Sequence, residues 1–218
     1  MKFHIPTLLE VLDNPVSGKT KHLTSVIGVI GEDLCAGIYK HYRDNKVEIL
    51  QENVTEGKKK GKWLDRWIVD DANKFLYQTE IKNWAGAAIG GYRLEHKASH
   101  EELEKVATRR YGNIHNDLIN DVMYIAKVRR AMRKPVVYQD YTVTPLLLFW
   151  MPVSDNPETL NPECVITCPP KKELFNEVTI FSCSLYLRSL SKKRKRYITI
   201  DAPNIKARLK MLESIIVA

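Results

Sequence analysis

The sequence has no long run of apolar residues. Its longest apolar stretch, Leu146–Val153, is much shorter than the roughly 20 residues of a membrane-spanning helix, and it contains Pro152. The N-terminal residues form no extended apolar segment ahead of a small-residue cleavage site, so a secretory signal is not expected. We therefore expect a cytoplasmic protein that has no membrane partner.

Cysteine is scarce, and no internal repeat is present. Four cysteines in 218 residues are too few for a disulfide scaffold, which favours a reducing compartment. Cys164 and Cys168 have no second pair nearby, and the six histidines form no metal-spaced pair, so zinc and iron–sulfur sites are not expected. The glycines match no nucleotide-binding loop, and we expect no organic cofactor.

Positive charge is concentrated in short runs of the chain. The sequence has 34 Lys and Arg against 26 Asp and Glu, a net charge of +8, and without nine clustered cations this would fall to −1. Such clusters suit an anionic polymer, although a solvated loop tip is the simpler explanation. In a eukaryotic host the second run could also serve as a nuclear localisation signal. The runs are Lys58, Lys59, Lys60 and Lys62, and then Lys192, Lys193, Arg194, Lys195 and Arg196.

The order of the expected elements indicates an α/β fold with a mixed central sheet flanked by helices. Apolar residues at helical spacing predict a first helix, and three strand-like runs follow it. Residues 70–73 have turn chemistry and would fold the third strand back on the second as a hairpin. The helix is predicted over residues 24–42 and the strands over residues 47–54, 63–69 and 74–84.

The remainder of the chain carries fewer signals for chemistry. Arg129, Arg130 and Arg133 end a predicted helix, where they would face a nucleic acid or simply complement the helix dipole. We treat residues 1–218 as a single domain, with a core of about residues 20–150 and an extension of about residues 151–218 that completes the sheet or serves recognition or assembly. The expected elements are helices near 92–110 and 114–133, a buried strand at 146–151, a long surface connection at 152–170, a strand at 178–187 that pairs with 197–200, and a helix at 205–216.

Three charged residues stand on the two strands of the expected hairpin. Glu80 and Lys82 project from one face of their strand because side chains alternate, and antiparallel pairing would bring Asp65 alongside Glu80. Burying such charges among apolar neighbours is costly without partners. A divalent cation would offset the carboxylate repulsion, and oxygen ligands favour Mg²⁺ or Mn²⁺. An exposed ion-pair ladder is the simpler alternative.

The order of the acidic residues resembles that of the PD-(D/E)xK nuclease superfamily: Glu32 in the first helix, then Asp65, then the motif Glu80-x-Lys82. This superfamily has the restriction-endonuclease-like fold and also includes Holliday-junction resolvases. The resemblance covers residues 24–84, and Leu64 stands where the motif often has proline. It implies that Asp65, Glu80 and the backbone carbonyl of Ile81 bind Mg²⁺, with Mn²⁺ able to substitute. It also implies that Lys82 positions or activates water and that Glu32 assists, through a second metal or a bridging water.

The resemblance implies a metal-dependent endonuclease that hydrolyses DNA in a prokaryotic or phage defence, restriction or recombination setting. Its expected partners are DNA and either a second copy of the chain or the other subunits of a larger nuclease or defence complex. In this interpretation the three basic clusters contact DNA phosphates. The alternatives are an inactive DNA-binding or assembly subunit, an RNA-processing nuclease, and a basic interaction module in which Glu80 and Lys82 form only a structural pair.

Overall fold

The computed structural model describes residues 1–13, 21–50, 66–82, 138–150, 161–167 and 177–215. No helix in these segments is long and apolar enough to cross a membrane. The elements are β1 (Lys2–His4), α1 (Ile5–Asp13), α2 (Lys21–Tyr42), β2 (Val47–Leu50), β3 (Arg66–Asp70), β4 (Phe75–Lys82), β5 (Thr142–Phe149), β6 (Glu163–Thr167), β7 (Glu177–Ser182), α6 (Cys183–Lys192), β8 (Tyr197–Thr199) and α7 (Pro203–Ile215).

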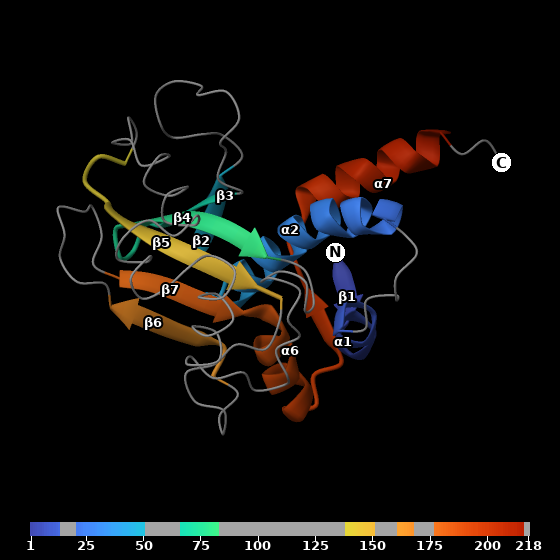
Figure 1. Ribbon diagram of the computed structural model, residues 1–218, viewed down its shortest axis with the longest axis horizontal. Coiled ribbons are helices and arrows are strands. Elements are labelled where there is room, and N and C mark those ends of the chain that lie inside the picture. Colours follow the sequence, from blue (N-terminus) through green and yellow to red (C-terminus); the bar gives the residue numbers. More distant parts are fainter. Residues whose placement is uncertain (14–20, 51–65, 83–137, 151–160, 168–176, 216–218) are drawn as a thin grey trace.

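A mixed six-stranded sheet, in the order β2-β3-β4-β5-β7-β6, forms the centre of the fold (Figure 1). β2, β3 and β4 make an antiparallel meander, β5 and β7 continue the sheet parallel to β4, and β6 is an antiparallel edge strand. The prediction of an α/β chain with a mixed central sheet flanked by helices is confirmed. The buried strand expected at 146–151 is confirmed over residues 146–149, the end of β5, whereas residue 151 lies outside the described residues.

The hairpin expected between β3 and β4 is confirmed. Asp70 pairs with Phe75 at its closed end, and Arg66 pairs with Thr79 at its open end. One carboxylate oxygen of Asp70 accepts from the backbone N–H of Asn73 at 3.1 Å, and the other accepts from the Asn73 side-chain amide at 2.9 Å. These two hydrogen bonds are the local contacts that Asp and Asn commonly make in turns.

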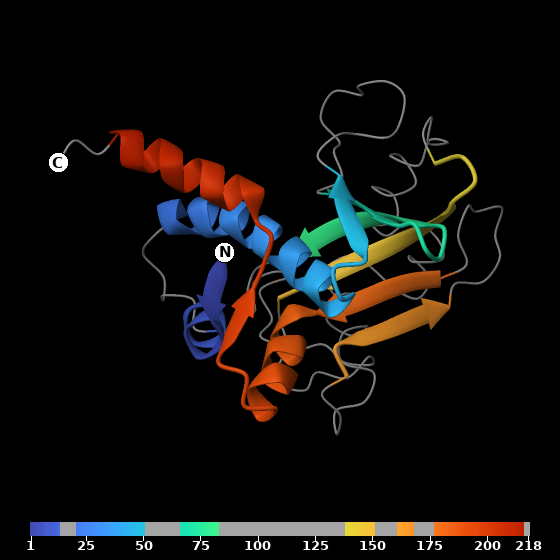
Figure 2. The same cartoon turned by 180° about the vertical axis from the view of Figure 1, so that it is seen from behind.

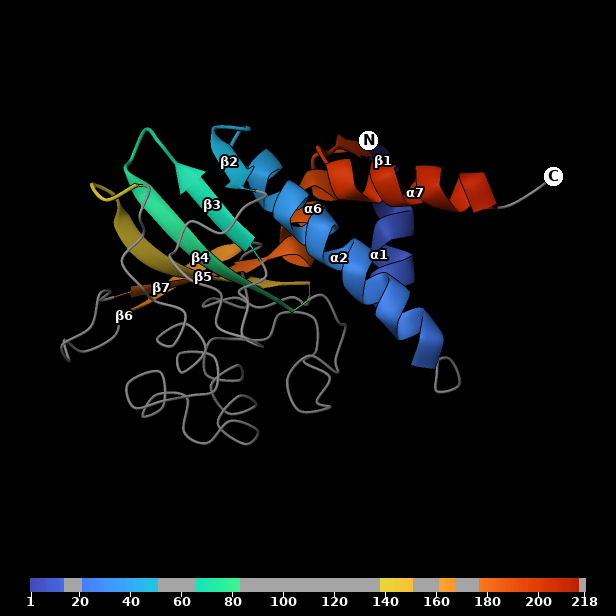
Figure 3. The ribbon, with the colours of Figure 1, turned by 90° about the horizontal axis from the view of Figure 1, so that it is seen from above.

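Helix α2 crosses one face of the sheet, and α7 lies beside it (Figure 3). On the sheet side, the ring of Tyr39 packs against Tyr77 and Phe181 with centroids 6.1 and 5.1 Å apart. On another side, Gly37 lies so close to Ile200 that an added Cβ would stand 2.0 Å from its Cγ2 atom. The helix is therefore packed on more than one side here, and residues 33–39 are all buried.

Three expectations for the C-terminal third are wrong. Residues 183–187 are helical rather than extended: Ser182 caps α6 by accepting from the backbone N–H of Leu185 at 3.3 Å, so the chain leaves the sheet at Cys183. β8 pairs with β1, not with β7, because α6 carries the chain away from the sheet before β8 begins (Figure 2). Residues 163–167 are the edge strand β6 and not part of a surface connection.

Other expectations are confirmed in part or lie outside the described residues. The first helix starts at Lys21 rather than at residue 24 and ends at Tyr42 as expected, and the last helix spans Pro203–Ile215. The strand expected at 47–54 is observed over Val47–Leu50. The helices expected near 92–110 and 114–133 lie outside the described residues.

Candidate active site

The two faces of β4 have different characters. Tyr77 and Ile81 point toward α2 and belong to the main hydrophobic core. Leu76, by contrast, packs with Trp67 of β3 in a second, smaller cluster. Because side chains alternate along a strand, Gln78 and Glu80 project from the same face as Leu76, opposite to α2. We call this the second face of the sheet.

Glu80 is buried on the second face, with 1 % of its surface exposed. In the row of residues across the sheet, it pairs with Leu147 of β5, which in turn pairs with Ile180 of β7. Both neighbours are buried and apolar. A carboxylate in this position costs several kcal/mol of hydration, by order of magnitude, unless a partner offsets the loss. Packing alone therefore gives no reason for an acid at this position.

The other two members of the expected triad are only partly described. Lys82 is the last residue of β4 and pairs with Phe149 of β5 through its backbone, while its side chain lies outside the described part. Asp65 lies outside the described residues, next to Arg66, the first residue of β3. Among the described residues, no group of three acidic, histidine or cysteine side chains is placed to hold a metal ion.

Gln78 is a polar residue of the second face that sequence reasoning missed. It pairs with Trp67 across the β3–β4 ladder, and none of its surface is exposed. Neither its amide oxygen nor its amide nitrogen has a hydrogen-bond partner within the described part of the chain. Leaving a buried amide in this state costs about 1–3 kcal/mol. The available signal was the alternation Gln78-x-Glu80-x-Lys82, which puts three polar residues on one face of a central strand.

Glu32 lies at the same end of the sheet as Glu80. It belongs to α2, however, and therefore lies on the face of the sheet opposite to the second face. Its Oε2 atom is 3.8 Å from Nη1 of Arg66, and its side chain is 35 % exposed. Arg66 pairs with Thr79 and lies one register position from Glu80. The described geometry thus brings Glu32 to the open end of the β3–β4 hairpin, beside Arg66, and not onto the second face.

The neighbouring acid, Asp33, has a structural role. Its buried carboxylate accepts from Nη2 of Arg66 at 3.2 Å, from the side-chain amide of Asn204 at 2.9 Å and from the backbone N–H of Ile205 at 3.1 Å. Ile205 lies in the first turn of α7, where backbone N–H groups have no partners inside the helix. Asp33 therefore joins α2, β3 and α7.

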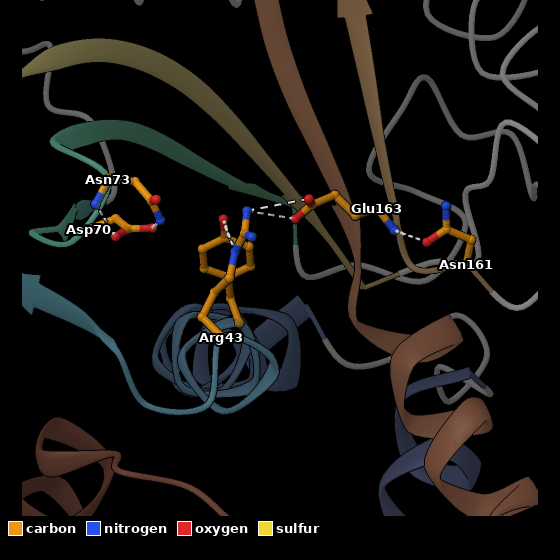
Figure 4. A network of polar contacts seen from close by, with 6 residues as sticks. Arg43, Asp70, Asn73, Asn161 and Glu163 are labelled. Atoms are coloured by element: carbon orange, nitrogen blue, oxygen red, sulfur yellow. Dashed lines mark hydrogen bonds and ion pairs between the residues drawn. The ribbon is translucent and has the colours of Figure 1, made fainter.

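A second polar network crosses the α2 face of the sheet at its β6 edge (Figure 4). Arg43 donates from Nε to the hydroxyl of Tyr39 at 3.0 Å and from Nη2 to Oε1 of Glu163 at 3.3 Å. Burial raises the pKa of Glu163, and the charge of Arg43 opposes this shift. Burial also raises the pKa of Tyr39. These groups connect the end of α2 to the edge strand β6, and we assign them a structural role.

The basic clusters expected from the sequence are described only in part. Residues 192–196 end α6 and form the turn into β8, and all five side chains are exposed. Residues 58–62 and the arginines at 129, 130 and 133 lie outside the described residues. Comparisons of the chain with protein-family models, curated proteins and solved structures found no match. Any function therefore has to be inferred from the chain's own residues.

Proposed function

We propose that the chain is a metal-dependent nuclease of the PD-(D/E)xK type that hydrolyses phosphodiester bonds in DNA, with its active site on the second face of β4. The observation that carries the proposal is Glu80, a buried carboxylate whose neighbours on β5 and β7 are the buried apolar residues Leu147 and Ile180. The element order supports it: a helix, an antiparallel three-strand meander and a parallel neighbour for the third strand.

The donor chemistry of the site fits a hard divalent cation. The Glu80 carboxylate and the Ile81 carbonyl offer oxygen ligands of the kind that Mg²⁺ and Mn²⁺ accept. In this proposal the β3–β4 ladder continues by one residue beyond the Arg66–Thr79 pair, which would set Asp65 opposite Glu80. When bound, such a cation lowers the pKa of a water ligand and offsets the charge that develops on the phosphate.

The remaining groups would orient the reactants. Lys82, two residues beyond Glu80, would hold the attacking water or stabilise negative charge on the phosphate. The amide of Gln78 would donate to a phosphate oxygen or accept from that water, which would satisfy a buried group that has no hydrogen-bond partner among the described residues. Glu32 would act indirectly, through its contact with Arg66 at the open end of the hairpin.

The test is nicking of supercoiled plasmid DNA with Mg²⁺ or Mn²⁺ by the wild-type chain and by Glu80→Gln, Lys82→Ala and Asp65→Asn. Lys82→Ala should lose cleavage by about 10²- to 10⁴-fold, the range for a group that takes part in proton transfer. Glu80→Gln and Asp65→Asn should lose cleavage because each removes a charged oxygen ligand of the cation, and all three variants should retain DNA binding. Glu163→Gln is the matched control, because it neutralises a sheet glutamate on the opposite face. Equal cleavage by Glu80→Gln and wild type would refute the proposal.

Stability separates catalysis from a structural ion pair. If Glu80 is a metal ligand, Glu80→Gln removes a buried charge without changing the shape of the side chain. Without metal, the variant should then be at least as stable as the wild-type protein. If Glu80 instead forms only a structural ion pair, the same substitution should destabilise the protein and leave nucleic-acid binding intact. Parallel assays on matched RNA, and DNA binding without cleavage, identify the RNA-processing and inactive-subunit alternatives.

A further inference from the structure

The turn between α6 and β8 holds five consecutive cations in an ordered backbone. We call residues 192–196 the basic turn. The backbone N–H groups of Lys193, Arg194 and Lys195 donate to the α6 carbonyls of Ser189, Ser191 and Leu190 at 3.3, 2.9 and 3.0 Å, and Arg194 takes the left-handed conformation, with φ 60°. Five exposed cationic side chains thus project from a short, hydrogen-bonded backbone segment.

The basic turn has no acidic partners within the described part of the chain. None of its side chains forms an ion pair there. Asp201, the exposed acid that follows β8, pairs instead with Lys40 at 3.4 Å. Closely spaced like charges without counter-charges repel one another, and an anionic ligand would relieve that repulsion. The positive charge of the basic turn also affects a neighbouring histidine. The pKa of His41 is lowered, mainly by burial and then by the charge of Lys195.

An exposed aromatic ring follows the basic turn. Tyr197 begins β8, pairs with His4 of β1 and is 53 % exposed. Lys2 lies with its Nζ atom 4.4 Å from the ring centroid, and the His4 ring lies 5.2 Å away. Lys2, His4, Tyr197 and Thr199 form the exposed face of the β1–β8 ribbon, whereas Ile198 points inward and is buried. We call this exposed face the ribbon face.

We propose that the basic turn and the ribbon face together bind a single-stranded segment of nucleic acid, with phosphates on the turn and a base stacked on Tyr197. Cations that follow the backbone, combined with an aromatic ring for the bases, are the recurring chemistry of single-strand binding. An acidic peptide or a lipid surface would also contact the cations, but a nucleic acid offers both phosphates for the turn and planar bases that stack on the ring. Sequence alone identified the cations but not the ring beside them.

This surface is separate from the candidate active site. α6 starts where β7 ends, and residues 183–191 carry the chain about 14 Å before the basic turn is reached, at a rise of about 1.5 Å per residue. In Figure 1 the far end of α6 lies away from β4. Binding here does not depend on cleavage, so it can be measured whether or not the chain is a nuclease.

The experiment is fluorescence anisotropy of a labelled oligothymidylate with the full chain in the presence of a chelator, so that no cleavage occurs. Tyr197→Ala should weaken binding by about 5- to 150-fold, the usual effect of removing a stacking aromatic ring, and Tyr197→Phe should restore it. The double change Lys193→Ala and Lys195→Ala should reduce the slope of log affinity against log salt by about 1.4, since each phosphate contact contributes about 0.7 on a single strand.

The control is the double change Lys206→Ala and Lys210→Ala, which removes two exposed cations from α7. It should leave affinity and salt slope close to wild type. Equal weakening by the control would overturn the proposal, because it would assign binding to net charge alone. Unchanged binding by the Tyr197→Ala and basic-turn variants would also overturn it. So would turn-dependent binding to phosphatidylglycerol vesicles without binding to the oligonucleotide, which would assign the turn to a lipid surface.

Discussion

Two adjacent carboxylates on α2 share one arginine, and their replacement should have opposite effects. Asp33 is buried and accepts three hydrogen bonds, from Arg66, Asn204 and Ile205. Glu32 is 35 % exposed and lies 3.8 Å from the same guanidinium. We predict that Asp33→Ala destabilises the fold strongly, whereas Glu32→Gln changes stability little.

The magnitude follows from the three donors that Asp33→Ala would leave buried. Removal of one partner of a buried ion pair costs about 3–5 kcal/mol. Glu32 would still face Arg66, but the amide of Asn204 and the backbone N–H of Ile205 would also lose this acceptor. This is a large part of the roughly 5–15 kcal/mol by which folded domains are usually stable. For a chain of this size, each kcal/mol lowers the melting temperature by about 2–4 °C, so we expect a decrease of about 6–20 °C.

The measurement is urea and thermal unfolding followed by circular dichroism. Asp201→Ala is the matched control: its carboxylate is 66 % exposed and lies 3.4 Å from Lys40, so its loss should cost less than about 1 kcal/mol. If Asp33→Ala is no more destabilising than Asp201→Ala, the assignment of Asp33 as the junction of α2, β3 and α7 is wrong. If Glu32→Gln keeps its stability but loses DNA cleavage, Glu32 supports cleavage indirectly through its contact with Arg66, as proposed.

Three further outcomes are expected. Gly37→Ala should destabilise the protein by about 1–3 kcal/mol in urea unfolding, and Ile200→Ala should offset part of this loss in the double variant, because the new methyl group meets Ile200. Asp70→Ala removes both side-chain hydrogen bonds of the β3–β4 turn and should cost about 1 kcal/mol; no change would show that the turn is held by its neighbours. Lys195→Ala should raise the pKa of His41, as measured by NMR titration, because it removes a positive charge that lowers it. Since the folded chain then binds the His41 proton more readily, less stability should be lost as the pH falls below 6.5, the ordinary pKa of histidine.

The elements that could be predicted were those whose cause is local. The turn at Asp70–Asn73 follows from residues that bond to their own neighbours, and β5 follows from a continuous apolar run. Glu80 and Lys82 could be assigned to one face of a strand because alternation is a property of the extended backbone. The basic turn could also be identified from the sequence, because its five cations are consecutive in the chain.

The missed features depend on partners that are distant in the chain. β8 has the pattern of a sheet strand, yet its partner is β1, nearly 200 residues earlier: His4 pairs with Tyr197. Cys183–Leu187 reads as a continuation of β7, but the Ser182 cap and burial of one helical face make it α6. Glu32 and Asp33 are adjacent acids in the sequence, and only the arrival of α7 distinguishes them, because it gives Asp33 two further donors.

The sequence by itself therefore determined the α/β class, the hairpin and the polar alternation of β4, since these arise from the backbone geometry of neighbouring residues. Tertiary structure alone decided that Glu80 and Gln78 are buried, that Asp33 is a structural acid, and that Tyr197 stands beside Lys2 and His4. Burial and long-range pairing are set by which elements pack together, and no local pattern records that choice.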